Sequence, residues 1–319
     1  MNNLKHISTQ TLQSMQVVSW GHTNNLKAMT FNQFNDWVAS GLHGSLNYLA
    51  DERKDKRKSL TQVYPDAKSA LVFLFDYRAA AKLNQEGKPT SKIASYTIGF
   101  DDQDYHFWIK EKLKTIGELL KEQDENLSFD ISLDVHPVLE RDLAYRAGLG
   151  WFGKNSMLIN KEFGSYQLIG SLILNKELGL TLKEIETDHC GTCTRCIDAC
   201  PTNAILDNTT IDASKCISTF TIETFKDESP PKGYPTKTNE VFGCDICQQV
   251  CPWNTKPLSK VESLLTSKWY DFFNRSFDKI YKEISEMSNN EFKKFFKGSS
   301  FERGGKRALL KNLKLFIES

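Results

Sequence analysis

The pattern of apolar and polar residues over the first 175 positions predicts both strands and helices. Residues 69–75 form an almost continuous apolar run, which is typical of a buried strand. Residues 108–123 place their apolar side chains along one helical stripe. Residues 129–135 alternate between apolar and polar and predict a half-buried strand, and residues 168–174 are again apolar. This alternation of strand and helix patterns indicates an α/β (α+β) fold.

Three consecutive domains are predicted. Residues 1–180 form the α/β (α+β) domain, and residues 181–257 hold every cysteine and predict a ferredoxin-like module. Residues 258–319 predict a short helical C-terminal segment that is basic near its end. Within the module, the Pro- and Gly-rich residues 226–239 predict an exposed loop.

Composition places the chain among ordinary globular proteins. It has 319 residues, of which 39% are hydrophobic and 25% charged, with a formal net charge of +1. This charge gives no overall attraction to nucleic acid, so any RNA contact needs a local basic patch. The apolar runs are too short to span a bilayer, and the N-terminus lacks an apolar targeting core. We therefore expect a cytoplasmic protein with no membrane partner.

The eight cysteines carry the strongest chemical signal. They occur as C-x2-C-x2-C-x3-C-P, then a single cysteine, then C-x2-C-x3-C-P, and the first run has the spacing of bacterial ferredoxins with [4Fe–4S] clusters. In two-cluster ferredoxins the last cysteine of a run binds the other cluster. The predicted ligand sets are therefore Cys190, Cys193, Cys196 and Cys251 for one cluster, and Cys200, Cys216, Cys244 and Cys247 for the other.

Other uses of these cysteines fit less well. Disulfides are disfavoured in a cytosolic protein, where thiols stay reduced. Zinc sites also use C-x2-C units, but the first run crowds four ligands more tightly than zinc spacing usually does. A pure electron-transfer protein needs nothing beyond the clusters. Because roughly 180 residues precede the module, we expect the electrons to reach something bound there. The sequence has neither a Rossmann G-x-G-x-x-G after a strand nor a P-loop.

Several stretches combine into a more specific resemblance. They are 41–49 (Gly-x-His-Gly-x3-Tyr-Leu with Asn47), 94–96 followed by 104–106, 139–141, 147–155 (Ala-Gly-Leu-Gly-Trp-Phe-Gly-Lys-Asn), 216–223 and 244–254. In these stretches the chain resembles the epoxyqueuosine reductase family, enzymes of tRNA modification that use cobalamin and iron–sulfur clusters. The similarity extends over nearly the whole chain, and 147–155 and 244–254 are its longest and most specific parts.

The resemblance implies a reaction. The family reduces the epoxide of epoxyqueuosine to the alkene of queuosine at the wobble position of certain tRNAs. Base-off cobalamin would bind the first domain, and the two [4Fe–4S] clusters would deliver electrons to reach cob(I)alamin, which attacks the epoxide carbon. The implied partners are a tRNA anticodon stem-loop and an electron donor such as a flavodoxin or ferredoxin, and the chain is taken as a monomer.

The resemblance also assigns site residues. Asp134 is the proton donor by its place in the Asp-x-x-Pro turn, and burial over the corrin would raise its pKa. Taken without the resemblance, Asp134 would simply cap a turn. His136 is interpreted as a turn or pocket residue rather than a cobalt ligand. The residues assigned to cobalamin binding are Arg57, Tyr96, Thr97, Asp134, Lys154, Asn155, Leu158, Ile169, Ser218, Asp245 and Gln248.

Some of these assignments carry a more local expectation. Tyr96 and Thr97 are placed at a strand end facing the cofactor, and Leu158 and Ile169 would form an apolar wall, although core packing is the ordinary role of such residues. Asp245 lies inside the second cysteine loop and is expected to tune its cluster by hydrogen bonding.

Local basic residues are the candidates for tRNA contact, although a charged face is more often simply solvated. The target nucleotide must leave the anticodon stack, so an aromatic clamp such as Tyr105 or Tyr234 is expected. The residues assigned to tRNA binding are Lys226, Lys232, Lys237, Arg303, Lys306 and Arg307. Two competing functions are a reductive-dehalogenase-like corrinoid reductase of a small molecule and a nucleic-acid-binding zinc module.

Overall fold

Two sets of segments pack into separate units in the computed structural model, which describes residues 4–207, 209–224, 229–231, 233–235, 238–262 and 265–317. Unit 1 comprises Met1–His43, Asn47–Asp76 and Trp108–Cys193. Unit 2 comprises Gly44–Leu46, Tyr77–Phe107 and Thr194–Ser319. Both units are therefore built from segments that are far apart in the sequence.

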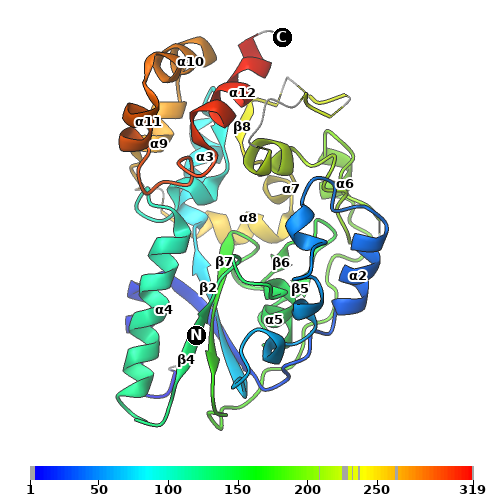
Figure 1. Ribbon diagram of the computed structural model, residues 1–319, viewed down its shortest axis with the longest axis vertical. Helices are drawn as coiled ribbons and strands as arrows, with labels where there is room; N and C mark the ends of the chain where they lie inside the picture. Colours follow the sequence, from blue (N-terminus) through cyan, green and yellow to red (C-terminus); the bar gives the residue numbers. More distant parts are fainter. Residues whose placement is uncertain are drawn as a thin grey trace. The chain divides into compact units, whose positions relative to one another are not determined.

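Unit 1 is built on a four-stranded antiparallel sheet in the order β1-β2-β7-β4 (Figure 1). The strands are β1 (Val17–Thr23), β2 (Ser69–Asp76), β7 (Gln167–Leu174) and β4 (Phe129–Ser132). The two apolar runs predicted as strands, 69–75 and 168–174, pair with each other along their whole length at the centre of the sheet. Both predictions are confirmed.

Each face of this sheet is covered by a helix. On one face, Ile109 and Leu113 of α4 (Tyr105–Lys121) pack against Gly170, where an added Cβ would come within 2.9 Å of Ile109. On the other face, Leu143 of α5 (Glu140–Arg146) packs with Val72 of β2 in one buried cluster. Successive strand residues point to opposite faces, so the continuous apolar run of β2 supplies both cores. The helix predicted at 108–123 is confirmed as α4.

The remaining elements of unit 1 are short. A hairpin of β5 (Trp151–Phe152) and β6 (Leu158–Ile159) forms within the stretch 147–155 and the residues after it. The others are the helices α1 (Thr9–Ser14) and α2 (Phe31–Ala39) and the 3-10 turns η1 (Asn47–Leu49), η2 (Asp55–Lys58) and η3 (Leu60–Gln62).

Unit 2 combines the cysteine-rich segment with helices. Its parallel pair joins β3 (Lys92–Ile93) to β8 (Glu240–Phe242). The other elements are α3 (Arg78–Gly87), η4 (Ser95–Ile98), α6 (Arg195–Ala199), the π-helical turn η5 (Thr219–Glu223), α7 (Ile246–Gln249), α8 (Pro252–Ser259), α9 (Lys268–Phe273), α10 (Phe277–Glu286), α11 (Asn289–Phe295) and α12 (Gly305–Ile317).

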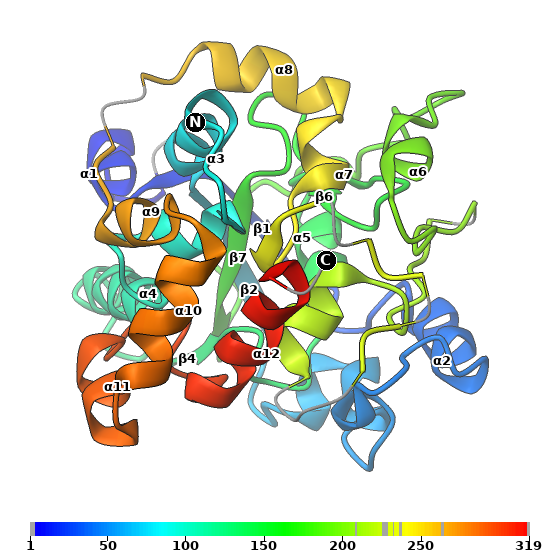
Figure 2. The same ribbon diagram turned by 90° about the horizontal axis from the view of Figure 1, so that it is seen from above.

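Aromatic residues form the core among the last helices of unit 2. Trp269 of α9 stacks on Phe296 at 5.1 Å, and the ring of Phe301 lies 4.8 Å from that of Phe273. All four side chains are buried. Figures 1 and 2 show α9, α10, α11 and α12 gathered together, so the predicted helical C-terminal segment is confirmed.

Two features differ from the sequence-based expectations. Residues 77–107 pack in unit 2 rather than with the sheet, because β3 pairs with β8 and Ala80 of α3 joins the aromatic core. The division at 180 and 257 therefore does not follow the units. Strand β4 ends at Ser132, because the chain turns there, and Val135 is 67% exposed. In the described part of the chain, no helix is long and apolar enough to cross a membrane.

A buried ion pair gives a test of unit 1. The Asp142 carboxylate accepts from Arg146 Nε at 2.5 Å, from Thr30 N at 2.7 Å and from Thr30 Oγ1 at 3.0 Å, and both charged side chains are buried. Asp142→Ala leaves the Arg146 charge buried and unpaired, so we expect a loss of about 3–5 kcal/mol in the free energy of unfolding. Chemical denaturation measures this loss. Asp36→Ala, an exposed aspartate on α2, is the control, and equal effects of the two substitutions would contradict the account.

Candidate active site

The thiols of the second predicted ligand set gather in unit 2. Cys200 follows α6, Cys216 precedes η5, Cys244 lies two residues before α7, and Cys247 lies within α7. Burial raises the pKa of the Cys247 thiol, and Cys216, Cys196 and Cys200 are near enough to raise it further. Burial likewise raises the pKa of Cys216, which Cys200 raises further. Such thiols stay protonated until bound iron stabilises their thiolates.

Backbone N–H groups point at these sulfur atoms. Ala204 N donates to Cys200 Sγ at 3.3 Å. The N–H groups of Ser218 and Thr219 donate to Cys216 and lower its pKa, opposing the effect of burial. Hydrogen bonds to cluster sulfurs set reduction potentials. Ser218, assigned from the sequence to the cofactor, therefore lies where it bonds a cluster ligand.

The other predicted set is divided between the units. Cys190 and Cys193 end unit 1, whereas Cys196 and Cys251 belong to unit 2. Cys196 lies in the first turn of α6, and Cys251 is buried immediately before α8. This ligand set stays a prediction.

The geometry of the thiols also bears on the zinc alternative. None of the eight cysteines, all of which the structure describes, forms a disulfide. Among the residues whose positions are described, no three His, Cys, Asp or Glu side chains are placed to hold one metal ion. Zinc needs its four ligands around a single ion, whereas the cysteines of a [4Fe–4S] cluster bind different iron atoms. The spacing of the cysteines remains the ground for preferring iron–sulfur clusters to zinc.

The turn that carries Asp134 connects β4 to α5. His136 N donates to Leu133 O at 2.9 Å and Val138 N to His136 O at 2.8 Å, which fixes the turn, and Asp134 lies exposed at its tip. The His136 ring packs within the turn, its Nδ1 lying 3.3 Å from Leu133 N and its ring 6.0 Å from that of Tyr64. The protein therefore does not itself bury Asp134, and a raised pKa would need a bound group to cover it.

Arg57 lies beside the residues that follow this turn. It is 7% exposed, and it lines a small crevice with Pro137, Val138 and Leu139. Its guanidinium donates to Arg53 O at 3.1 Å, and burial lowers the pKa of Arg57. Arg57 and the Asp134 turn, which are 77 positions apart in the sequence, thus come together in unit 1.

Four other predicted cofactor residues lie in unit 1. Lys154 Nζ donates to Gly191 O at 2.8 Å, in the loop that carries Cys190 and Cys193. The buried Asn155 accepts from Met157 N at 3.2 Å. Leu158 belongs to the core cluster against α5, and Ile169 packs partly against it. These contacts show structural roles for all four side chains, and binding to the cofactor stays a prediction.

The predicted cofactor residues of unit 2 include one buried carboxylate, that of Asp245. Asp245 accepts from Ser95 N at 2.7 Å and from Ser95 Oγ at 2.6 Å, and Gln248 of α7 is also buried. Tyr96 and Thr97 lie in η4 rather than at a strand end, because β3 is only two residues long and ends at Ile93. The Thr97 hydroxyl is buried and donates to Ala94 O at 2.7 Å, so it is occupied within the turn.

Sequence reasoning missed two structural contributors near the cysteines. Ser95 fixes Asp245, and the only signal was its place in the stretch 94–96. Lys311 of α12 holds the turn after Cys216, donating to Phe220 O at 3.0 Å and Thr224 O at 2.6 Å. No local pattern links a C-terminal lysine to a cysteine 95 positions earlier.

A cysteine-rich unit in the same chain as an α/β (α+β) sheet unit defines an iron–sulfur oxidoreductase. Residues 189–254 match the family described as "4Fe-4S double cluster binding domain", and residues 57–135 match "Epoxyqueuosine reductase QueG, DUF1730". The epoxyqueuosine reductase of Cyclobacterium marinum is 42% identical over 255 residues, which cover 77% of this chain and 80% of the relative. The chain belongs to the epoxyqueuosine reductase family.

Solved structures of epoxyqueuosine reductases also resemble the fold of this chain. A crystal structure of epoxyqueuosine reductase with an epoxyqueuosine-modified tRNA-Tyr stem loop is 25% identical, with a TM-score of 0.74 over 97% of this chain and 79% of that one. The Bacillus subtilis enzyme is 27% identical, with a TM-score of 0.73 and the same coverage, and its aspartate-bearing catalytic loop is swung out of the active site. The predicted family, the fold class and the iron–sulfur clusters are confirmed, and the dehalogenase-like alternative is not favoured.

Removing one thiol tests the predicted ligand sets. Two [4Fe–4S] clusters hold about eight irons per chain. Cys216→Ala takes a ligand from one set only, so we expect about four irons to remain. Iron analysis after anaerobic purification measures this. Cys193→Ala should retain as much iron as Cys216→Ala but lose the other cluster. Electron paramagnetic resonance distinguishes which cluster each variant has kept. Retention of about eight irons in Cys216→Ala would refute the partition.

Proposed function

We propose that this chain reduces the epoxide of epoxyqueuosine in a tRNA anticodon to the alkene of queuosine, with cobalamin as cofactor and two [4Fe–4S] clusters as the source of electrons. The observation that carries the proposal is the match of residues 57–135 to the epoxyqueuosine reductase model, because this segment holds both Arg57 and the Asp134 turn. A family member has been crystallised with the modified stem loop, which supports tRNA as the substrate.

The residues beside the Asp134 turn suit cobalamin chemically. The crevice of Arg57 is lined by apolar side chains, including Leu60 and Val138, and by the cations Lys56, Arg57 and Arg146. It has no room for a ligand inside it, so cobalamin would have to lie over its rim. An apolar macrocycle with amide and phosphate groups at its rim needs this combination of apolar wall and hydrogen-bond donors. When bound, reduced cobalamin would supply a strong nucleophile for the epoxide carbon.

Asp134 would then supply the proton that the opened epoxide oxygen requires. A carboxyl group donates a proton near neutral pH only if its pKa is raised, and covering it with an apolar group has that effect. Its exposed position at the tip of the turn allows cofactor and substrate to cover it. The displaced catalytic loop of the Bacillus subtilis relative supports a turn that moves over its ligands.

Replacement of this acid tests the assignment. Asp134→Asn keeps the size of the side chain but cannot donate the carboxyl proton. We expect turnover of an epoxyqueuosine stem-loop to fall by at least about 100-fold, while cobalamin and iron contents stay unchanged. Nucleoside mass spectrometry follows the product. Asp130→Asn, at an exposed aspartate of β4, is the control. Full activity of Asp134→Asn would remove Asp134 from the acid role.

The basic residues assigned to tRNA fall into three groups. Lys226, Lys232 and Lys237 lie outside the described residues. Arg303 pairs with Glu223 at 2.8 Å, and Lys306 donates to Ser285 O at 2.9 Å and to Met287 O. Arg307 is exposed on α12. The contacts of Arg303 and Lys306 fix the C-terminal helices and reduce what these two side chains can offer to RNA.

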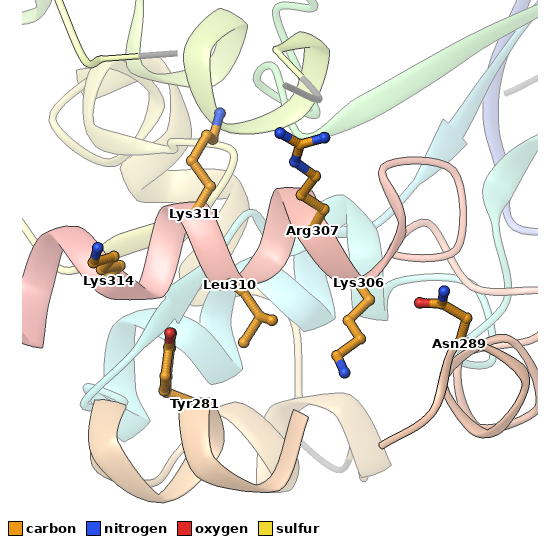
Figure 3. A pocket seen from close by; sticks show the side chains of 7 residues that line it. All are labelled: Tyr281, Asn289, Lys306, Arg307, Leu310, Lys311 and Lys314. Carbon is orange, nitrogen blue, oxygen red and sulfur yellow. The ribbon is translucent and has the colours of Figure 1, made fainter. Parts of the chain in front are cut away.

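A groove of about 320 Å³ runs beside α12 and is lined by Tyr281, Asn289, Lys306, Arg307, Leu310, Lys311 and Lys314 (Figure 3). Four of these seven residues are cations and none is acidic. Figure 3 shows Lys306 pointing toward the helix of Tyr281, whereas Arg307 and Lys311 point away from it. The cations are therefore spread over the surface of α12, which suits an extended phosphate backbone better than one small anion.

Charge removal from this helix tests the tRNA contact. Arg307→Ala with Lys314→Ala removes the two exposed cations of α12. We expect weaker binding of any stem-loop, modified or not. The slope of the logarithm of the binding constant against the logarithm of the salt concentration should fall in magnitude by about 1 for each phosphate that the helix no longer binds. Fluorescence anisotropy at several salt concentrations measures both. The control is Lys110→Ala with Lys114→Ala on α4, and equal effects of the two pairs would refute a specific contact at α12.

The electron donor is proposed to be a flavodoxin or ferredoxin. The proposal also takes the chain to act as a cytoplasmic monomer.

A further inference from the structure

Tyr234 has a hydroxyl group whose position is unexplained by the protein alone. Its oxygen is buried, and it has no hydrogen-bond partner among the described residues. Its ring lies 5.1 Å from that of Phe220, in η5. Burying a donor without a partner is unfavourable, so we expect an acceptor beside it that the described residues do not supply. This burial also argues against Tyr234 as a clamp for a flipped base.

The surroundings of Phe220 bring this hydroxyl to the second ligand set. Phe220 N donates to Cys216 O at 3.1 Å, so Tyr234 packs on the turn that follows Cys216. Lys311 Nζ lies 3.9 Å above the centre of the Phe220 ring and bonds the carbonyls of this turn. The ring against which Tyr234 rests is therefore held in place by α12.

Electrostatics place the hydroxyl close to two of the cysteines. Burial raises the pKa of Tyr234, and Cys244, Glu240 and Cys216 are near enough to raise it further. A phenol carries its proton at physiological pH without any such shift, so this hydroxyl can donate its O–H to an electron-rich acceptor. Cluster sulfur atoms, both cysteinyl and inorganic, are acceptors of this kind.

We propose that Tyr234 donates its O–H to a sulfur atom of the cluster on Cys200, Cys216, Cys244 and Cys247, and thereby raises the reduction potential of that cluster. The direction follows from charge: the reduced cluster carries one more negative charge, so the hydrogen bond stabilises it more than the oxidised cluster. The inference rests on the proposed ligand sets, but it needs neither tRNA nor turnover. Tyr234 would thus tune electron delivery through a direct hydrogen bond to the cluster.

Tyr234→Phe removes the hydroxyl and keeps the ring against Phe220. Each cluster of the purified protein is titrated electrochemically and followed by electron paramagnetic resonance. We expect the equilibrium constant for reduction of one cluster to fall about tenfold, equivalent to about 59 mV for one electron, with the other cluster and the iron content unchanged. Tyr270→Phe, at a tyrosine of α9 in the same unit, is the control and should shift neither cluster.

Two results would overturn the proposal. One is an unchanged potential for both clusters in Tyr234→Phe. The other is loss of iron from that variant, which would make Tyr234 a packing residue instead. The wild-type protein offers an independent measurement if the variant does not fold. Electron–nuclear double resonance in H2O and D2O should reveal one exchangeable proton, beyond those of backbone N–H groups, coupled to the cluster that loses its signal in Cys216→Ala. Its absence would also overturn the proposal.

Because these readouts use no RNA, their failure is distinct from a failure of the proposed reaction. A protein that shows the potential shift but leaves epoxyqueuosine unchanged would keep the inference and refute the substrate. If the protein reduces epoxyqueuosine but Tyr234→Phe leaves the cluster potentials unchanged, the proposed reaction stands and the inference about Tyr234 is refuted.

Discussion

The predicted ligand set requires four thiols from three separate segments of unit 2 to meet on one iron–sulfur cube. Cys200 follows α6, Cys216 precedes η5, and the third segment brings Cys244 and Cys247 with α7. This third segment is placed by the pairing of β8 with β3. Because iron binds only when all four sulfurs are in reach, the contacts that place these segments also determine whether a cluster forms.

Close packing positions the chain before Cys244. Gly243 has a φ of +74° and lies against Ala94, where an added Cβ would come within 2.4 Å of the Ala94 side chain. Asp245 then bonds Ser95 through two hydrogen bonds. Residues 94 and 95, which belong to a stretch identified from the sequence for other reasons, thus support the second cysteine loop.

The C-terminal helix has two functions in this account. Asn312 is fully buried and donates to Thr221 O at 2.8 Å and to Val241 O at 2.9 Å, so α12 joins η5 to β8. Lys311 adds bonds to the same turn. Arg307 and Lys314 of this helix are exposed to solvent, and they are the cations that we propose for RNA binding. A basic cluster in the sequence therefore separates, in the structure, into cations that stabilise the iron–sulfur unit and cations that face solvent.

Sequence patterns predicted the features that depend on local periodicity or spacing. The runs at 69–75 and 168–174 and the stripe at 108–123 became β2, β7 and α4 because burial of apolar side chains determines all three. Cysteine spacing predicted two clusters for the same local reason. The placement of 77–107 in unit 2 was not predictable, because two-residue strands such as β3 carry no periodic signal and pair with residues about 150 positions away.

The same limit applies to the candidate site. The type of residue at Asp134 and Arg57 was evident from the sequence, but their neighbours were not, since the crevice of Arg57 is completed by residues 137–139. Hydrogen bonds to sulfur, such as that from Ala204 N to Cys200, come from backbone groups that any residue type would supply. Tyr234 was recognisable only by its burial and its unpartnered hydroxyl.

The most direct test of the account is one turnover assay, carried out on anaerobically purified protein with both clusters present. The substrate is an anticodon stem-loop that contains epoxyqueuosine, the reductant is strong, and cobalamin is either added or omitted. The account predicts that the modified nucleoside loses one oxygen atom, as seen by mass spectrometry, only when cobalamin is present. Unchanged RNA in a protein that has bound both clusters and cobalamin would contradict it.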